Sequence, residues 1–195
     1  MIPLLLLASS ALAQVPVVIE TTMGAIHVEL DDKHAPGTTA NFLKYVDAGH
    51  FQGGRFHRTV KTNPDNQPQS AIKIEVIQGG VNPDRKDQGF GAIKLERTTA
   101  SGLKHRDGTI SMARFQPDSA VSDFFICIGD QPSLDFGGQR NPDGQGFAAF
   151  GKVTQGMEIV RKIQAAPSGA GHDGTNPTIQ RLTPPVAIVS VTRRK

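Results

Sequence analysis

The chain has few side chains of the kinds that form covalent intermediates or bind metals. Cys127 is the only cysteine. A lone thiol inside an apolar run forms no internal disulfide and is more typical of packing than of a nucleophile. The six histidines show no close metal-ligand pairing: His27, His34, His50, His57, His105 and His172. No glycine-rich phosphate loop leads from a strand into a helix, and a hydrolase triad has no supporting motif. We therefore expect neither a metal nor a cofactor.

The most informative stretch is 108–129, in which two strand-like runs flank a polar turn. In the second run, alternate residues fall on two faces: Phe124, Ile126 and Ile128 on one, and Asp123, Phe125 and Cys127 on the other. Ile110 and Met112 share a face of the first run. The pattern predicts a β-hairpin in which Phe124 packs inward and Phe125 points out.

This hairpin resembles the signature of the cyclophilins, the peptidyl-prolyl cis-trans isomerases. Four further segments match that family in the same order: Phe56-His57-Arg58, Val76-Ile77-Gln78-Gly79-Gly80, Phe150-Gly151-Lys152-Val153 and Gly156-Met157-Glu158-Ile159-Val160. The resemblance covers most of residues 17–193. It implies catalysis of rotation about X-Pro peptide bonds (EC 5.2.1.8).

Short strands dominate the elements that must position these residues. Besides the hairpin, strand-like runs occupy 17–20, 25–30, 51–59, 72–78, 147–150 and 186–191, and amphipathic patterns predict helices at 35–49 and 157–165. Alternation in 51–59 predicts that Phe56 and Arg58 share one side of the strand and His57 the other. Many short strands and two helices predict a mainly β fold, a closed antiparallel barrel capped by two α-helices, and the resemblance implies eight strands. Residues 62–71 are predicted to be a loop that only interrupts the sheet, within an insertion at 61–73 where familiar cyclophilins have a tighter connection.

The resemblance also implies the roles of the site residues. Arg58 is expected to donate to the proline nitrogen, with Gln78 orienting it. Phe125 is expected to form the floor of a proline socket. The other expected substrate contacts are Phe56, Val76, Asp123, Leu134, Phe147 and the backbone of Ala113 and Arg114. Glu75 and Asp123 depart from the family pattern, and either carboxylate would weaken catalysis by pairing with Arg58.

The amino-terminal sequence predicts export. In residues 1–13 an apolar run precedes Ala11-Leu12-Ala13, a pattern that a signal peptidase reads, and the run is too short to span a bilayer. We expect residues 14–195 to form one domain, exported to the periplasm or secreted. The expected partners are proline-containing segments of unfolded or exported proteins. We expect a monomer with no stable membrane insertion.

Charge argues against a nucleic-acid partner. The formal net charge is +3, and the last three residues, Arg193, Arg194 and Lys195, account for all of that excess. The rest of the chain has no net charge and lacks the broad basic patch that phosphate binding needs. The alternative that stays open is a non-catalytic chaperone or scaffold that binds proline-containing segments, which an isomerisation assay on a short peptide distinguishes from an enzyme.

Overall fold

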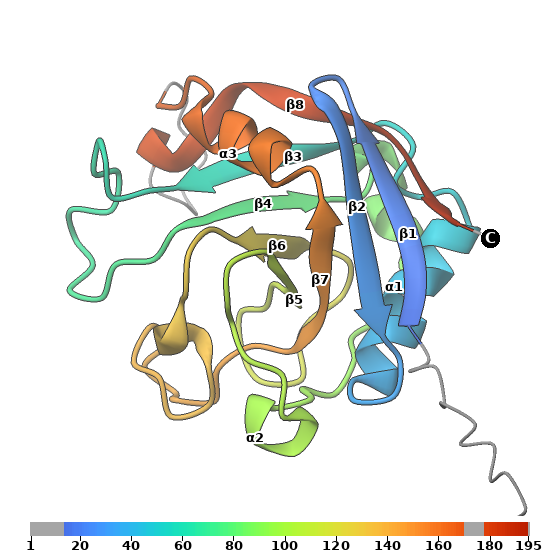
Figure 1. The fold of residues 1–195 in the computed structure, drawn as a ribbon, viewed down its shortest axis with the longest axis horizontal. Helices are drawn as coiled ribbons and strands as arrows, with labels where there is room; N and C mark the ends of the chain where they lie inside the picture. Colours follow the sequence, from blue (N-terminus) through green and yellow to red (C-terminus); the bar gives the residue numbers. More distant parts are fainter. Residues whose placement is uncertain (1–13, 170–177, 195) are drawn as a thin grey trace, which may run out of the picture.

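The computed structural model describes residues 14–169 and 178–194, which form one closed β-barrel (Figure 1). Its eight strands are β1 (Gln14–Thr21), β2 (Gly24–Asp31), β3 (Gly54–Val60), β4 (Val76–Gly80), β5 (Thr109–Met112), β6 (Phe124–Cys127), β7 (Ala149–Gln155) and β8 (Arg181–Arg193). They follow the order β1-β2-β7-β5-β6-β4-β3-β8, and every neighbouring pair is antiparallel. The predicted fold class is confirmed.

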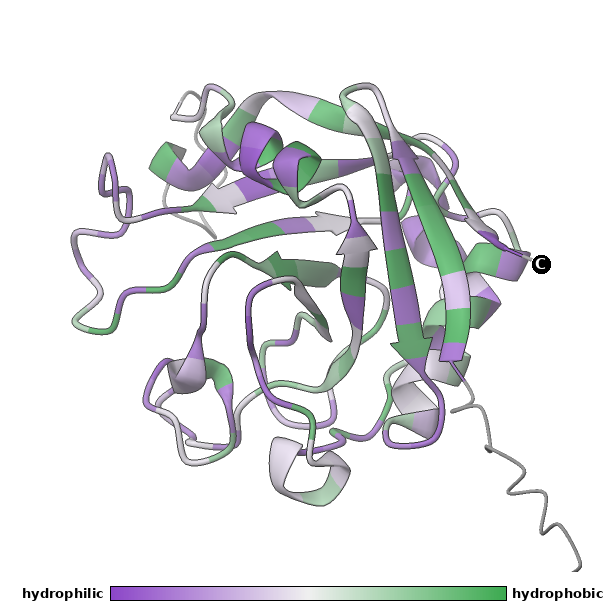
Figure 2. Ribbon diagram, in the orientation of Figure 1, coloured by the Kyte–Doolittle hydropathy of each residue, from purple (hydrophilic) through white to green (hydrophobic). Residues whose placement is uncertain are grey.

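The two predicted helices are present as α1 (Pro36–Asp47) and α3 (Met157–Ala165). Both bury apolar side chains in the barrel core: Phe42 of α1 lies 5.6 Å from Phe124 between ring centroids, and Ile163 of α3 is fully buried in the same cluster. Figure 2 shows hydrophobic and hydrophilic residues alternating along β2, in step with the alternating burial of its side chains. Four short elements were not predicted: α2 (Thr98–Ser101) and the 3-10 turns η1 (Pro83–Gln88), η2 (Pro132–Leu134) and η3 (Thr178–Gln180).

The predicted hairpin forms from β5 and β6, and β6 also pairs with β4. Phe124 is fully buried inside the barrel, whereas Phe125 belongs to a second apolar cluster on the outer face. That cluster consists of Val60, Ile74, Val76, Phe125, Cys127 and Leu134, with Ala113 and Phe147 packed against it. The alternation of the two aromatics is therefore confirmed, and the outer cluster becomes the wall of a cavity.

The prediction that Phe56 and Arg58 share one side of their strand is wrong. The register of β3 against β4 shifts between these residues: Phe56 is opposite Gly79, but Arg58 is opposite Gln78. His57 is the extra residue of a β-bulge, and a bulge reverses the alternation that follows it. Phe56 consequently packs inside the barrel and Arg58 faces outward.

The strand predicted at 72–78 begins only at Val76. Before Val76, the backbone of Ile74 forms its hydrogen bonds with the side chain of Gln67 and not with a neighbouring strand. The Gln67 side chain donates to the carbonyl of Ile74 (2.7 Å) and accepts from its N–H (3.2 Å). Gln67 belongs to the 61–73 segment, which Figure 1 shows as a long excursion between β3 and β4 on the side away from the carboxyl terminus. The segment is therefore fastened to the outer cluster and does more than interrupt the sheet.

Two strands are longer than the predicted runs 147–150 and 186–191. Proline has no N–H to donate to a strand ladder, yet β8 pairs with β3 on both sides of Pro184 and Pro185, through Arg181 opposite Arg58 and Val186 opposite Phe56. No helix within the described residues is long and apolar enough to cross a membrane. The predicted signal segment, 1–13, lies outside those residues.

Candidate active site

A cavity of about 380 Å³ opens on the outer face of the barrel, over β3, β4 and β6. Nine of the ten predicted site residues line it: Arg58, Val76, Gln78, Ala113, Arg114, Asp123, Phe125, Leu134 and Phe147. We call this cavity the groove. Phe56 is the exception: it precedes the bulge at His57 and lies fully buried in the barrel core, where it cannot contact a ligand in the groove.

The apolar end of the groove is a socket of three side chains. Phe125 and Phe147 meet edge to face, with ring centroids 5.3 Å apart, and Leu134 from η2 is buried beside them. Leu134 is brought there by the 129–146 loop, which lies between β6 and β7. Its loop neighbour Phe136 lies outside the groove and is 41% exposed.

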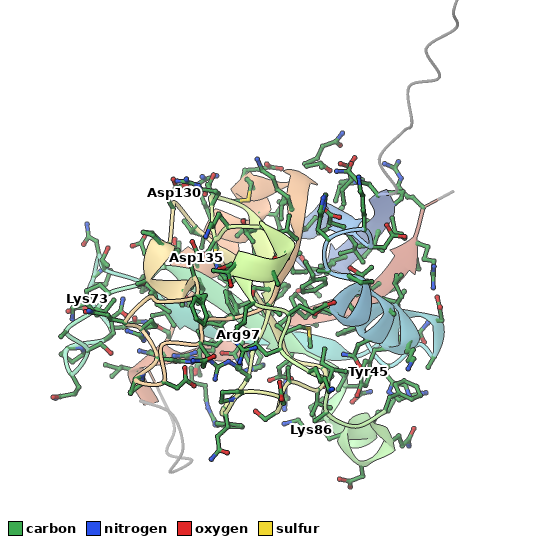
Figure 3. The ribbon with its side chains drawn as sticks, turned by 90° about the horizontal axis from the view of Figure 1, so that it is seen from below. Tyr45, Lys73, Lys86, Arg97, Asp130 and Asp135 are labelled. Carbon is green, nitrogen blue, oxygen red and sulfur yellow. The ribbon has the colours of Figure 1, made fainter. Side chains whose placement is uncertain are left out.

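A buried hydrogen-bonded group supports the socket from behind. The His105 ring stacks on Phe125 at 5.9 Å, and its two nitrogens contact Asp135 (2.8 Å) and the Ser111 hydroxyl (2.9 Å). Burial opposes ionisation of Asp135, but the hydrogen bonds from His105 prevail and lower the pKa of that carboxyl below 3.8. Asp135 is labelled in Figure 3. Because Ser111 is fully buried, this group has no access to substrate and serves to fix the floor.

Arg58 lies at the polar end of the groove and is held by two neutral amides. Its Nη1 donates to Oε1 of Gln78 (2.8 Å), and its Nε donates to Oε1 of Gln180 (2.9 Å). Burial, with a smaller contribution from the positive charge of Arg140, lowers the pKa of Arg58 to about 10. The guanidinium is thus charged at neutral pH, and no carboxylate in the described part of the chain pairs with it.

Neither carboxylate that departs from the family pattern neutralises Arg58. Glu75 faces away from the groove and accepts hydrogen bonds from the Thr62 N–H and hydroxyl. Asp123 lies 3.7 Å from Nε2 of His57. Burial lowers the pKa of His57 below 6.5, and the charge of Asp123 offsets only part of that effect. His57 is therefore neutral above pH 7.

Some of the backbone groups expected to pair with the substrate already form hydrogen bonds within the protein. The Ala113 N–H donates to the Asp123 carbonyl (2.9 Å). The Ala113 carbonyl and the Arg114 backbone groups make no hydrogen bond to another described residue. The Arg114 side chain packs on Phe147, with its guanidinium carbon 5.1 Å from the ring centroid, and pairs with Asp143 at 2.7 Å. Hydrogen bonds from Arg114 lower the pKa of Asp143 to about 2.

Sequence reasoning missed several groove residues. Phe115 is 92% exposed and lines both the groove and a second cavity of about 410 Å³ beyond Arg58 and Asp123. Arg140 lines the groove from the 129–146 loop, and Gln180 holds Arg58 from η3. Phe115 directly follows Arg114, a predicted substrate contact, so its position in the sequence could have identified it. Gln180 lies in a Gly/Pro-rich stretch with no pattern that would reveal it.

The groove contains no arrangement for metal chemistry. Among residues 14–169 and 178–194, no group of three or more His, Cys, Asp and Glu side chains is placed to hold a metal ion. Cys127 is buried behind Phe125, and burial raises the pKa of its thiol. The groups that face the groove are hydrogen-bond donors, acceptors and apolar surface.

The closed antiparallel barrel, with an arginine beside an apolar socket on its outer face, defines the class as cyclophilin-like. The family model "Cyclophilin type peptidyl-prolyl cis-trans isomerase/CLD" matches residues 16–193. The chain belongs to this family and is a peptidyl-prolyl cis-trans isomerase.

Three relatives illustrate the match. A peptidyl-prolyl cis-trans isomerase of Streptomyces antibioticus is 33% identical over 88% of this chain and 94% of its own length. Peptidyl-prolyl cis-trans isomerase A of Dickeya dadantii is 38% identical over 80% of this chain and 74% of its own. In structure, a cyclophilin-type isomerase of Cryptosporidium parvum, described as solved in the presence of the dipeptide Ala-Pro, superposes with a TM-score of 0.68, covering 92% of this chain and 99% of its own at 23% identity. This last likeness concerns the fold alone.

Proposed function

We propose that the groove binds a proline ring in the socket of Phe125, Leu134 and Phe147 and that Arg58 donates to the proline nitrogen. Rotation of a peptide bond costs about 18–20 kcal/mol, because the amide nitrogen shares its lone pair with the carbonyl. In the twisted state that lone pair is localised on the nitrogen, and a fixed positive donor favours it there. The observation that carries the proposal is a guanidinium held by neutral amides beside an apolar socket.

Each remaining residue has a role in this proposal. Gln78 orients Arg58, and Val76 forms part of the apolar wall. The Ala113 carbonyl and the Arg114 backbone pair with the substrate chain, an interaction that tolerates any side chain. Asp123, at the boundary of the two cavities, contacts the residue next to proline. Phe56, on the inner face of β3, acts only indirectly, by packing in the barrel core.

We also propose that the natural substrates are proline-containing segments of exported proteins and that the enzyme assists their folding outside the cytoplasm. The apolar leader in residues 1–13 supports export. We further propose that the enzyme acts as a monomer.

Isomerisation of a short X-Pro peptide, followed by exchange NMR with and without the protein, tests the function. We expect line broadening that grows with protein concentration and saturates with peptide. A protein that binds the peptide without exchanging its two isomers would instead be a scaffold.

A further inference from the structure

Two amide oxygens restrain the Arg58 guanidinium at different nitrogens. Gln78 accepts from Nη1 and Gln180 accepts from Nε, at 2.8 and 2.9 Å. A guanidinium has five N–H donors in one plane, so two fixed acceptors set the direction of that plane. The other three donors make no hydrogen bond within the described chain, which leaves them for a substrate.

Gln180 is itself held in one orientation. Its side chain is 2% exposed, and its Nε2 donates to the main-chain carbonyl of Asn66 (2.9 Å). This contact decides which end of the amide faces Arg58: if the amide were flipped, its NH2 group would oppose the Arg58 N–H and its oxygen would oppose the Asn66 carbonyl. The position of Asn66 therefore determines that an acceptor faces Arg58.

Asn66 belongs to the 61–73 segment and is anchored back onto β3. Its Oδ1 accepts from the Lys61 N–H (2.9 Å), and its Nδ2 donates to the carbonyl of Thr59 (2.9 Å), the residue next to Arg58. Asn66 is 6% exposed. The segment thus leaves β3, turns, and returns to present one carbonyl to Gln180.

The far side of the segment is fastened as well. Arg140, which lines the groove, donates to Oε1 of Gln67 (3.1 Å) and to the Ile72 carbonyl. Lys73, at the outer edge of the view in Figure 3, donates to Asp65 (2.8 Å) and to the Gln67 carbonyl (2.6 Å). With both sides bonded, the Asn66 carbonyl is part of a fixed scaffold and not of a free loop.

We propose that Gln180 is a positioning residue for Arg58, and that the 61–73 segment sets its orientation through the Asn66 carbonyl. The inference rests on the proposed role of Arg58. Neutral amides suit this purpose because they fix the guanidinium without cancelling the charge that acts on the proline nitrogen. An acidic residue in place of Gln180 would hold Arg58 and weaken that charge.

The test uses the full chain and a short X-Pro peptide. Gln180→Met keeps the volume but removes both hydrogen bonds, and we expect kcat to fall roughly 10- to 30-fold, with KM changed less than about twofold, because the displaced donor acts mainly in the transition state. Gln131→Met is the matched control: Gln131 is also buried and donates to a backbone carbonyl (2.7 Å), but it lies outside the groove. The control should leave kcat unchanged.

A double-mutant cycle separates positioning from a merely structural role. If Gln180 acts through Arg58, Gln180→Met should cause no further loss of kcat in an Arg58→Ala background. A second full loss there, or an unchanged kcat in Gln180→Met alone, would overturn the inference. Full turnover of Arg58→Ala would instead refute the proposed role of Arg58. If Gln180→Met does not fold, Asn66→Ala replaces it in the same cycle, with an expected loss of about threefold that also vanishes without Arg58.

Discussion

At the scale of single residues, one end of the groove offers apolar contacts and the other end offers a positive charge. In the proposed mechanism, Phe125, Leu134 and Phe147 offer surface that a proline ring would bury equally in its planar and twisted states. Arg58 offers a charge that matters most when the nitrogen lone pair is localised. Substitutions at the two ends of the groove should therefore change different kinetic constants.

Phe125→Ala should weaken peptide binding. We expect KM to rise roughly tenfold, as for about 1.5 kcal/mol of lost apolar contact, together with a lower thermal midpoint, because the ring also covers Cys127 and packs on His105. Steady-state kinetics by exchange NMR measures both constants. Phe136→Ala, in the same region but outside the groove, is the control. An unchanged KM in Phe125→Ala would remove Phe125 from the socket.

The rate should not depend on pH between about 7 and 9. His57 borders the second cavity next to Asp123, and burial lowers its pKa below 6.5. It is therefore neutral throughout this range, and its charge appears only as the pH falls below 7. The measurement is kcat/KM against pH; an inflection above pH 7 that disappears in His57→Gln would contradict this assignment.

At the scale of elements, local patterns could be predicted from the sequence, but contacts between residues far apart in the sequence could not. The alternation in 123–128 revealed that Phe124 and Phe125 face opposite ways, because a strand repeats every two residues. The same rule failed at Phe56 and Arg58, since a bulge depends on the register with β4 and leaves no mark in the residues of β3. Gln180 was invisible because its partner, Asn66, is 114 residues away.

The 61–73 segment should contribute to stability through Gln67. In Gln67→Ala the buried N–H and carbonyl of Ile74 lose their partner, and we expect the free energy of unfolding to fall by about 1–3 kcal/mol. Denaturant titration measures this change. Gln69→Ala alters an exposed glutamine of the same segment and should have little effect. Equal stabilities of the two variants would show that the segment is not fastened as described.

At the scale of the whole molecule, one barrel carries the entire groove. Its walls come from β3, β4, the β5–β6 hairpin and the 129–146 loop, which lie far apart in sequence. The barrel brings them together because its strand order places β6 between β5 and β4, and β4 beside β3. Fold class was predictable because the motifs occur in family order.

Export makes a prediction about the mature chain. If a signal peptidase cleaves after Ala13, protein recovered from the exported fraction should begin at Gln14, the first residue of β1. Intact-mass analysis of that fraction measures the amino terminus. Full-length chain found only in the cytoplasm would be inconsistent with the proposed location.

The proposed mechanism requires Arg58 to stabilise the twisted peptide bond, and the turnover of Arg58→Ala is the sharpest test of that role. We expect kcat to fall about 10²–10³-fold with KM little changed, as when one preorganised donor is lost, and Arg58→Lys to recover part of the rate because it keeps the charge but not the planar fork. The assay should run well below the thermal midpoint of each variant, because Gln180 loses its buried partner. Such a loss of kcat would support the account, whereas full turnover in Arg58→Ala would contradict it.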